Sequence, residues 1–250
     1  MFNFHTTPEA QISPLPNGWH LEIPAGKAGS YRVAQIDDYS DRPRKLFPLT
    51  APITLSLRCR TSDSLLPGTW GFGFWNDPFA LGLGLQGMAR RLPALPNACW
   101  FFHASAENHL SFDNSQLGSG FLAQTFRSPQ IPSALLAPGL LAVPLLFSQT
   151  IAKWLRAVSG KIIRQDGVRL NIDVTQWHAY NLTWRESEVA FSVDDALVFK
   201  SALSPQGTLG LVVWIDNQYA AWTPQGRIGL GTLQQESAGW MEIEGLEIVK

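Results

Sequence analysis

The sequence predicts a single, mostly antiparallel β-sandwich domain, and three observations support that class. Short alternating segments recur along most of the 250 residues, separated by turn-forming Gly, Pro, Asp and Asn. Hydrophobic residues make up 45% of the chain and charged residues 16%, which is typical of a protein with a large buried core. Sandwiches commonly reach this length as one unit. We therefore expect one all-β domain over residues 1–250.

Alternation between apolar and polar residues marks the expected strands. It is clearest at 53–60, where Cys59 falls on the same face as Ile53, Leu55 and Leu57. Asp194 and Asp195 predict a tight turn between two short strands. The other expected strands cover 19–23, 31–36, 69–75, 97–104, 110–112, 168–172, 178–184, 189–193, 196–199, 209–215 and 240–249. This regular spacing favours a sandwich or jelly roll.

Residues 128–165 interrupt the pattern and predict a partly helical insertion. Four prolines exclude a long strand, and 135–147 is strongly apolar. Apolar residues then recur at helical spacing and predict a helix with an apolar stripe, with Arg156 off that stripe. The stripe consists of Phe147, Ile151, Trp154, Leu155, Val158 and Ile162. Three interpretations stay open: a flank of the sandwich, a lid over a ligand cleft, or a helix resting on a membrane surface.

Composition also limits the partners and cofactors. The formal net charge of −1 offers no basic field for nucleic acid. The two cysteines, Cys59 and Cys99, predict reduced, buried thiols. No secretory leader is visible, so we expect a cytoplasmic protein. No apolar run is long enough for a transmembrane segment. We expect no cofactor and no metal, and the oligomeric state stays open.

The acidic loop at 37–41 is a candidate calcium site, because oxygen-rich loops bind calcium. It contains Asp37, Asp38 and Asp41, but it lacks glycine punctuation and a fixed ligand register. The sequence therefore favours a solvated loop.

Three stretches carry a family resemblance. Trp177-His178-Ala179-Tyr180-Asn181-Leu182-Thr183-Trp184, followed by 189–195, resembles a hairpin of the laminarinase-like glycoside hydrolases. Residues 241–248 are similar to that family's closing strand, and 68–75 is similar to its cleft-lining tryptophan strand. The resemblance implies a concanavalin A-like jelly roll with a ligand in its concave cleft.

The family's catalytic element, E-x-D-x-E, is missing from the expected place. Retaining hydrolysis needs two carboxyl groups about 5–5.5 Å apart. The corresponding strand reads Trp100-Phe101-Phe102-His103-Ala104-Ser105 and contains no Asp or Glu. The sequence therefore predicts no glycosidase of the usual paired-carboxylate kind and leaves open whether the protein is an enzyme.

Two similar segments supply the candidate site residues. Trp75-Asn76-Asp77-Pro78 and Trp214-Ile215-Asp216-Asn217-Gln218-Tyr219 each end a strand with an aromatic ring and an acid-amide pair. Rings stack on sugars or on apolar ligands, and Asp or Asn bind hydroxyl groups. Turn-forming and structural roles stay open for both segments. The candidate catalytic residues are Asp77, Asp216 and His103. The candidate ligand-binding residues are Trp70, Trp75, Asn76, Trp100, Trp214, Asn217, Gln218 and Tyr219.

Two functions follow from these residues. The first is a divergent carbohydrate-binding or carbohydrate-active protein with an oligosaccharide ligand. The second is a cyclase-like or isomerase-like enzyme, or a carrier, acting on an apolar small molecule in an aromatic pocket. In the second, aromatic rings would stabilise a cation and the Asp or His side chains would move protons. A structural module without a ligand is a third possibility.

Overall fold

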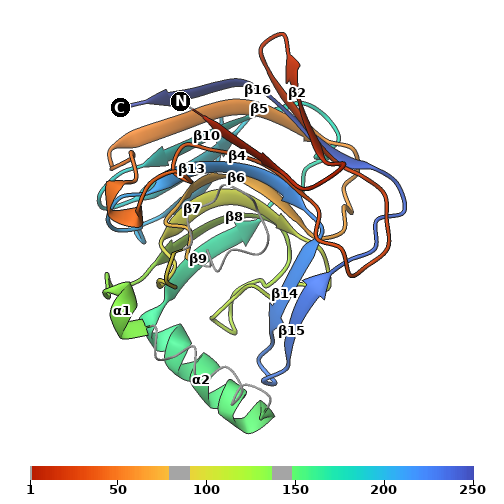
Figure 1. Ribbon diagram of the computed structural model, residues 1–250. Helices are drawn as coiled ribbons and strands as arrows, with labels where there is room; N and C mark the ends of the chain where they lie inside the picture. Colours follow the sequence, from red (N-terminus) through yellow and green to blue (C-terminus); the bar gives the residue numbers. More distant parts are fainter. Residues whose placement is uncertain (1, 79–90, 137–147) are drawn as a thin grey trace.

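The protein is a jelly-roll β-sandwich, as the computed structural model shows for residues 2–78, 91–136 and 148–250 (Figure 1). Sheet A has the strand order β1-β4-β13-β6-β7-β8-β9 and sheet B the order β12-β11-β10-β5-β16-β3-β2, and neighbouring strands run antiparallel. Sheet A comprises β1 (Asn3–Thr6), β4 (Val33–Asp37), β6 (Thr69–Trp75), β7 (Ala98–Ala104), β8 (Gly120–Arg127), β9 (Arg164–Arg169) and β13 (Gly210–Asp216).

Sheet B carries the predicted hairpin and the closing strand. It comprises β2 (Gln11–Leu15), β3 (Gly18–Ile23), β5 (Ile53–Thr61), β10 (His178–Trp184), β11 (Val189–Val193), β12 (Ala196–Ser201) and β16 (Gly239–Val249). A separate hairpin consists of β14 (Gln218–Trp222) and β15 (Ile228–Thr232). The described helices are a 3₁₀ turn (Arg44–Leu46), α1 (Ser133–Leu136) and α2 (Gln149–Ile162).

The main core lies between the two sheets because each sheet turns one apolar face inward. In β5 the inward side chains include Ile53, Leu55, Leu57 and Cys59, as the alternation predicted. Both cysteines are free and buried. Asp194 and Asp195 have positive φ angles of 48° and 65° and form the predicted tight turn.

Most of the expected strands are confirmed, with ends shifted by a few residues, but several elements were missed. The sequence did not predict β1, β2, β8, β14 or β15. The short strand expected at 110–112 is absent, because these residues form a loop instead. The strand expected at 168–172 lies earlier in the chain, where it forms β9.

The side of the helical insertion that the structure buries is not its apolar stripe. α2 is helical as expected, but its buried side chains are Ala152 and Arg156. Trp154 is 62% exposed, and Ile162 also faces solvent. Arg156 is buried because it donates to the backbone carbonyls of Ser111 and Trp222. The other part of the predicted lid, residues 137–147, lies outside the described residues.

No helix of the described residues is long and apolar enough to cross a membrane.

Candidate functional site

The outer face of sheet A, which points away from the sandwich core, carries a second hydrophobic cluster that is rich in aromatic rings and includes Phe112, Phe126 and Ile163. We give the name aromatic face to four of its rings, those of Trp75, Trp100, Phe102 and Trp214. The Trp75 and Trp214 rings are parallel to within 5°, with centroids 6.2 Å apart. Trp100 and Phe102 stack at 5.3 Å, and Phe102 stacks on Trp214 at 5.7 Å. The rings therefore form one continuous apolar floor across β6, β7 and β13.

Glycine makes room for this floor. Gly71 of β6 pairs with Trp214 of β13, and a Cβ on Gly71 would lie 3.0 Å from the Trp214 ring. The same Cβ would lie 2.5 Å from the carbonyl oxygen of Phe101. The glycine in the alternating segment 69–75 thus lets an indole ring lie flat against the sheet.

The tryptophan N–H groups of the aromatic face differ in their partners. Trp75 donates to the Tyr39 hydroxyl at 2.7 Å, and Trp214 donates to the Thr69 hydroxyl at 2.9 Å. The N–H of Trp100 is buried and has no hydrogen-bond partner among the described residues. A buried donor without a partner costs about 1–3 kcal/mol. Of the three tryptophans, Trp100 is therefore the one whose N–H lacks a hydrogen-bond acceptor.

Gln124 lies beside Trp100 and was missed by the sequence analysis. It is opposite Trp100 in the β7–β8 ladder and is 3% exposed. Its side-chain amide forms no hydrogen bond within the described part of the chain. The available signal was a glutamine in the apolar strand Phe121-Leu122-Ala123-Gln124-Thr125-Phe126. An amide next to the Trp100 N–H gives this position both donors and an acceptor.

Asp216 lies at one end of the aromatic face, in a neutral environment. Its carboxylate accepts hydrogen bonds from the Tyr31 hydroxyl, the Thr69 hydroxyl and the backbone N–H groups of Thr69 and Gln218. Burial raises the pKa of Asp216 from 3.8 to about 6, because the charged form is desolvated. The Thr69 hydroxyl connects it to the N–H of Trp214.

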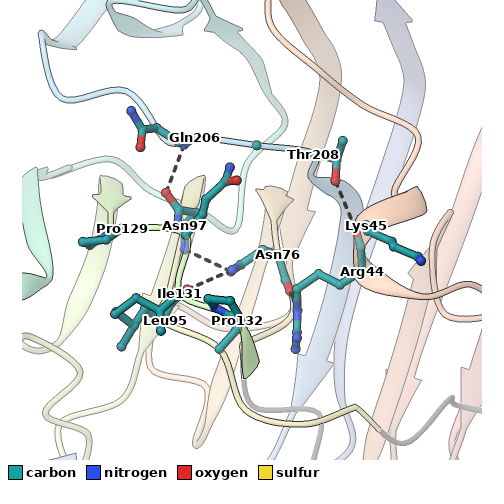
Figure 2. A pocket seen from close by; sticks show the side chains of 13 residues that line it. Arg44, Lys45, Asn76, Leu95, Asn97, Pro129, Ile131, Pro132, Gln206 and Thr208 are labelled. Atoms are coloured by element: carbon teal, nitrogen blue, oxygen red, sulfur yellow. Dashed lines mark hydrogen bonds between the residues drawn. The ribbon is translucent and has the colours of Figure 1, made fainter. Parts of the chain in front are cut away.

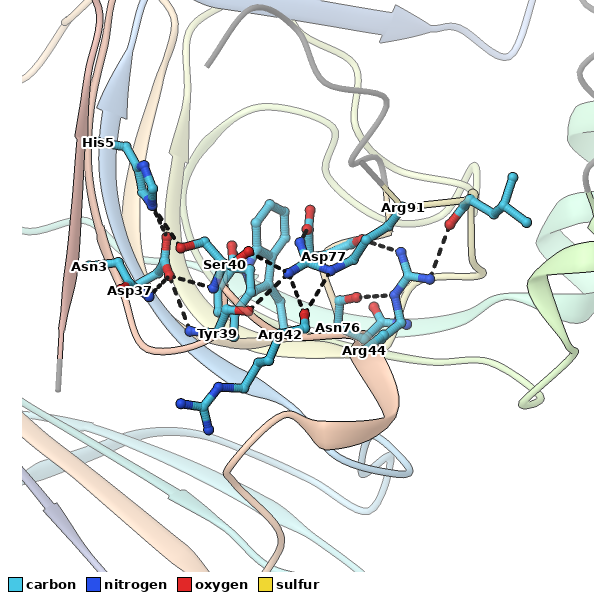
Figure 3. A network of polar contacts seen from close by, with 12 residues as sticks. Asn3, His5, Asp37, Tyr39, Ser40, Arg42, Arg44, Asn76, Asp77 and Arg91 are labelled. Atoms are coloured by element: carbon cyan, nitrogen blue, oxygen red, sulfur yellow. Dashed lines mark hydrogen bonds and ion pairs between the residues drawn. The ribbon is translucent and has the colours of Figure 1, made fainter. Parts of the chain in front are cut away.

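Asp77 lies at the opposite end and is ion-paired (Figure 3). Its carboxylate is 2.6 Å from the buried guanidinium of Arg91. Burial raises the pKa of Asp77, while the positive charges of Arg91 and Arg44 oppose that rise. Arg91 also donates to the carbonyl oxygens of Tyr39, Ser40 and Arg42. This network joins the end of β6 to the loop after β4.

The two aspartates are too far apart to act as one acid–base pair. β6 and β13 are antiparallel, so that Trp75 pairs with Gly210 while Thr69 pairs with Asp216. Six residues of strand separate the two ends, or about 20 Å. The similarity of the two segments in sequence does not bring their carboxyl groups together.

Two further candidates lie in the sandwich core, on the opposite side of sheet A. Trp70 is fully buried and stacks on His103 with ring centroids 5.4 Å apart. Burial lowers the pKa of His103 to about 4, and its Nδ1 has no partner among the described residues. The imidazole is therefore neutral at pH 7. Neither ring faces the aromatic face.

The remaining candidates hold the backbone. The Asn217 amide donates to the carbonyls of Ser30 and Leu233. The Asn76 amide donates to the carbonyl of Leu95 and accepts from the N–H of Asn97. Gln218 and Tyr219 are partly exposed residues of β14, away from the four rings.

A depression of about 470 Å³, lined by both polar and apolar side chains, lies at the Asp77 end of the sandwich (Figure 2). Its walls include Arg44, Lys45, Leu95 and Ile131, and contain no carboxylate among the described residues. The Arg44 guanidinium donates to the carbonyls of Asn76 and Asp77, so this cation holds the loop. The depression is thus built largely from groups that position the chain.

The acidic loop is not solvated, contrary to the sequence-based expectation. Asp37, Asp38 and Ser40 are buried, and only Asp41 of the three acids is exposed as expected. Asp37 accepts from the N–H groups of Tyr39 and Ser40, and Asp38 accepts from the N–H of Leu211. Within 2–78, 91–136 and 148–250, no three His, Cys, Asp or Glu side chains gather closely enough to hold a metal ion.

No protein-family model matches the sequence, and neither does any curated protein. Several solved structures are similar in fold. One is a glycoside hydrolase family 16 endo-glucanase from Bacteroides ovatus, with a TM-score of 0.47 and 10% identity over 96% of this chain and 85% of that one. The laminarinase catalytic domain from Thermotoga maritima has a TM-score of 0.49 and 10% identity, over 97% of this chain and 88% of that one. A β-glucanase from Bacillus licheniformis has a TM-score of 0.45 and 10% identity, over 96% of this chain and 82% of that one.

Proposed function

We propose that the protein binds a carbohydrate on the aromatic face of sheet A. The observation that carries the proposal is the floor of four rings, of which Trp75 and Trp214 are parallel and partly exposed. Flat aromatic surfaces stack on the apolar faces of sugar rings. The Trp75 and Trp214 N–H groups are held by Tyr39 and Thr69, so both rings are fixed before a ligand arrives.

Polar groups beside the floor support a hydroxyl-bearing ligand. The Trp100 N–H and the Gln124 amide lie on neighbouring strands, without hydrogen bonds among the described residues. Both groups are buried, so a sugar hydroxyl, which donates and accepts, would satisfy the N–H and the carbonyl only if the atoms that cover them moved aside. A hydrocarbon ligand would leave both groups without a partner.

The function we propose is binding, without a catalytic role for the aspartates. Asp77 is held by Arg91, and Asp216 lies about 20 Å away with four hydrogen-bond donors around it. On β7, the positions that face outward are Ala98, Trp100, Phe102 and Ala104, none of which titrates.

Affinity measurements with and without the two exposed rings test the proposal. Calorimetric titration with soluble β-glucans, mannans, xylans and alginates should find at least one ligand. Trp75→Ala and Trp214→Ala should each weaken its binding about tenfold or more. Trp240→Ala is the matched control, because Trp240 is also partly exposed but belongs to sheet B.

A second variant separates loss of binding from loss of folding. Gln124→Ala keeps all four rings and should also weaken binding of the same glycan. If no glycan binds, or if the Trp75 and Trp214 variants bind like the control, the proposal fails. Fatty acids and terpenoids belong in the same screen, since binding of these alone would favour the apolar-ligand function.

A further inference from the structure

The solvent-facing side of α2 presents a tryptophan between two lysines. Lys153, Trp154 and Lys161 are all exposed; helical geometry places Trp154 and Lys161 on the side opposite Ala152 and Arg156, and Lys153 on the flank between the two sides. Lys161 lies two turns from Trp154 on nearly the same line along the helix. We call these three residues the α2 surface.

This side chain arrangement is held rigidly. Arg156 donates to the carbonyls of Ser111 and Trp222, and the Trp222 N–H donates to the carbonyl of Ala152 at 3.1 Å. Gly226, in the turn between β14 and β15, lies against the backbone of Gln149 and Lys153. α2 therefore cannot rotate Trp154 inward without breaking these contacts.

The end of the molecule that contains α2 also exposes other large apolar side chains. Leu135 of α1 is 71% exposed, and Leu230 of β15 is 64% exposed. Figure 1 shows α1, α2 and the β14–β15 hairpin at the end of the molecule away from both termini. Exposed apolar side chains are ordinary on a protein surface, and others occur elsewhere, such as Leu65 at 82%, so it is their combination with the lysines of α2 that indicates an interaction surface.

Charge identifies the kind of partner. Residues 114–165 contain five Lys or Arg and no Asp or Glu, and residues 217–235 add Arg227, again without an acid. Since the whole chain has a net charge of −1, the remaining residues carry −7. The elements that expose Trp154, Leu135 and Leu230 thus carry a net positive charge because they contain no acids, although most of the 19 Lys and Arg lie elsewhere in the chain.

We propose that the α2 surface docks the protein on an anionic lipid bilayer. A helix that lies in the bilayer interface combines lysines with tryptophan or leucine, and tryptophan prefers the headgroup region. Each lysine near an anionic surface contributes about 1 kcal/mol. The surface is separate from the aromatic face, so docking does not depend on the proposed carbohydrate binding.

Co-sedimentation with lipid vesicles tests docking. The intact protein should bind vesicles of equal parts phosphatidylcholine and phosphatidylglycerol, and should not bind vesicles of pure phosphatidylcholine. Rising salt should release it, because salt screens the lysines. Lys153→Gln with Lys161→Gln should weaken binding about tenfold or more. Trp154→Ser should weaken it severalfold.

Leu197→Ser is the matched control, since Leu197 of β12 is 62% exposed, as is Trp154. All the substituted side chains face solvent, and far-ultraviolet circular dichroism confirms that each variant is folded. Failure to bind the anionic vesicles overturns the proposal. So does equal binding to both kinds of vesicle, or a Trp154 variant that binds like the control.

Discussion

The two strand ends with similar sequences, Trp75-Asn76-Asp77 and Trp214-Ile215-Asp216, differ in how they accommodate a buried carboxyl group. Asp77 faces the guanidinium of Arg91 at 2.6 Å, so a fixed positive charge compensates it. Asp216 faces only neutral donors, from Tyr31, Thr69 and Gln218, and its pKa rises to about 6. The Trp75 and Trp214 rings of the two segments nevertheless belong to one aromatic face.

The difference shows that the aromatic residue and the acid of each segment have separate tasks. The rings are parallel neighbours because β6 and β13 are adjacent strands. The acids lie at opposite ends because those strands are antiparallel. Asp77 fastens a loop through an ion pair, whereas Asp216 positions Thr69 and thereby the N–H of Trp214.

Removing the cation of the Asp77 end should have the largest effect. Arg91→Met leaves a buried carboxylate unpaired and three backbone carbonyls without their donor, so we expect a loss of about 3–5 kcal/mol in the free energy of unfolding. Urea denaturation at pH 7 measures it. Arg42→Met is the control: its ion pair with Asp41 is exposed, so the loss should stay below about 1 kcal/mol. Equal losses would contradict a special role for Arg91.

Asp216 should instead make the free energy of unfolding depend on pH. The folded-state pKa of about 6 lies above the unfolded value of about 3.9. Between these values the native state holds a proton that the unfolded chain has released, so rising pH destabilises the protein over that range and the loss persists above it. Asp216→Asn cannot titrate and escapes this loss. Relative to the unmodified protein, its free energy of unfolding should therefore rise by about 2 kcal/mol between pH 4 and pH 7.5.

Urea denaturation of both proteins at several pH values measures that difference. Asp38, whose pKa is also raised to about 6, is present in both proteins, so its contribution cancels. A difference that stays constant with pH would mean that Asp216 is already charged without cost in the folded state.

The aromatic face itself should respond to Gly71→Ala. The new methyl would lie 2.5 Å from a backbone carbonyl oxygen and 3.0 Å from the Trp214 ring. We expect a loss of about 1–3 kcal/mol in stability and a displaced Trp214 ring. Thermal unfolding measures the loss of stability, and weakened glycan binding reports the displaced Trp214 ring. Gly71 does not have a positive φ, so its loss would be steric; Gly29→Ala, which meets no atom within 4 Å but has a φ of 97°, shows the contrasting cost of backbone strain without a clash. Unchanged glycan affinity in Gly71→Ala would mean that Trp214 is not a binding ring.

How far the sequence could lead depended on whether a strand has one apolar face or two. In β5 only one face is apolar, and the alternation of Ile53, Leu55 and Leu57 gave the buried side correctly. In β6 and β7 both faces are apolar, so periodicity could not say that Trp70 and His103 point into the core while Trp75 and Trp100 point away.

Hydrogen bonds between residues far apart in the chain could not be predicted from the sequence either. Arg91 meets residues 39–42 through tertiary folding, with no pattern in the chain that connects them. In α2 the apolar spacing predicted the helix correctly but did not indicate its buried side, because Arg156 donates to backbone carbonyls in the loop at Ser111 and at Trp222. Hydrophobic periodicity does not register such hydrogen bonds.

The smallest effect we expect comes from Thr69→Val, which keeps the shape but removes the hydroxyl between Asp216 and Trp214. The carboxylate loses one of its four donors and the Trp214 N–H loses its acceptor, so we expect a loss of about 1 kcal/mol in stability. The pKa of Asp216 should rise further, because that donor favours the charged form. Its midpoint in a titration followed by carboxyl NMR measures this. Thr69→Ser retains the hydroxyl and should restore the midpoint; if Thr69→Val leaves it unchanged, the hydroxyl does not couple the acid to the ring.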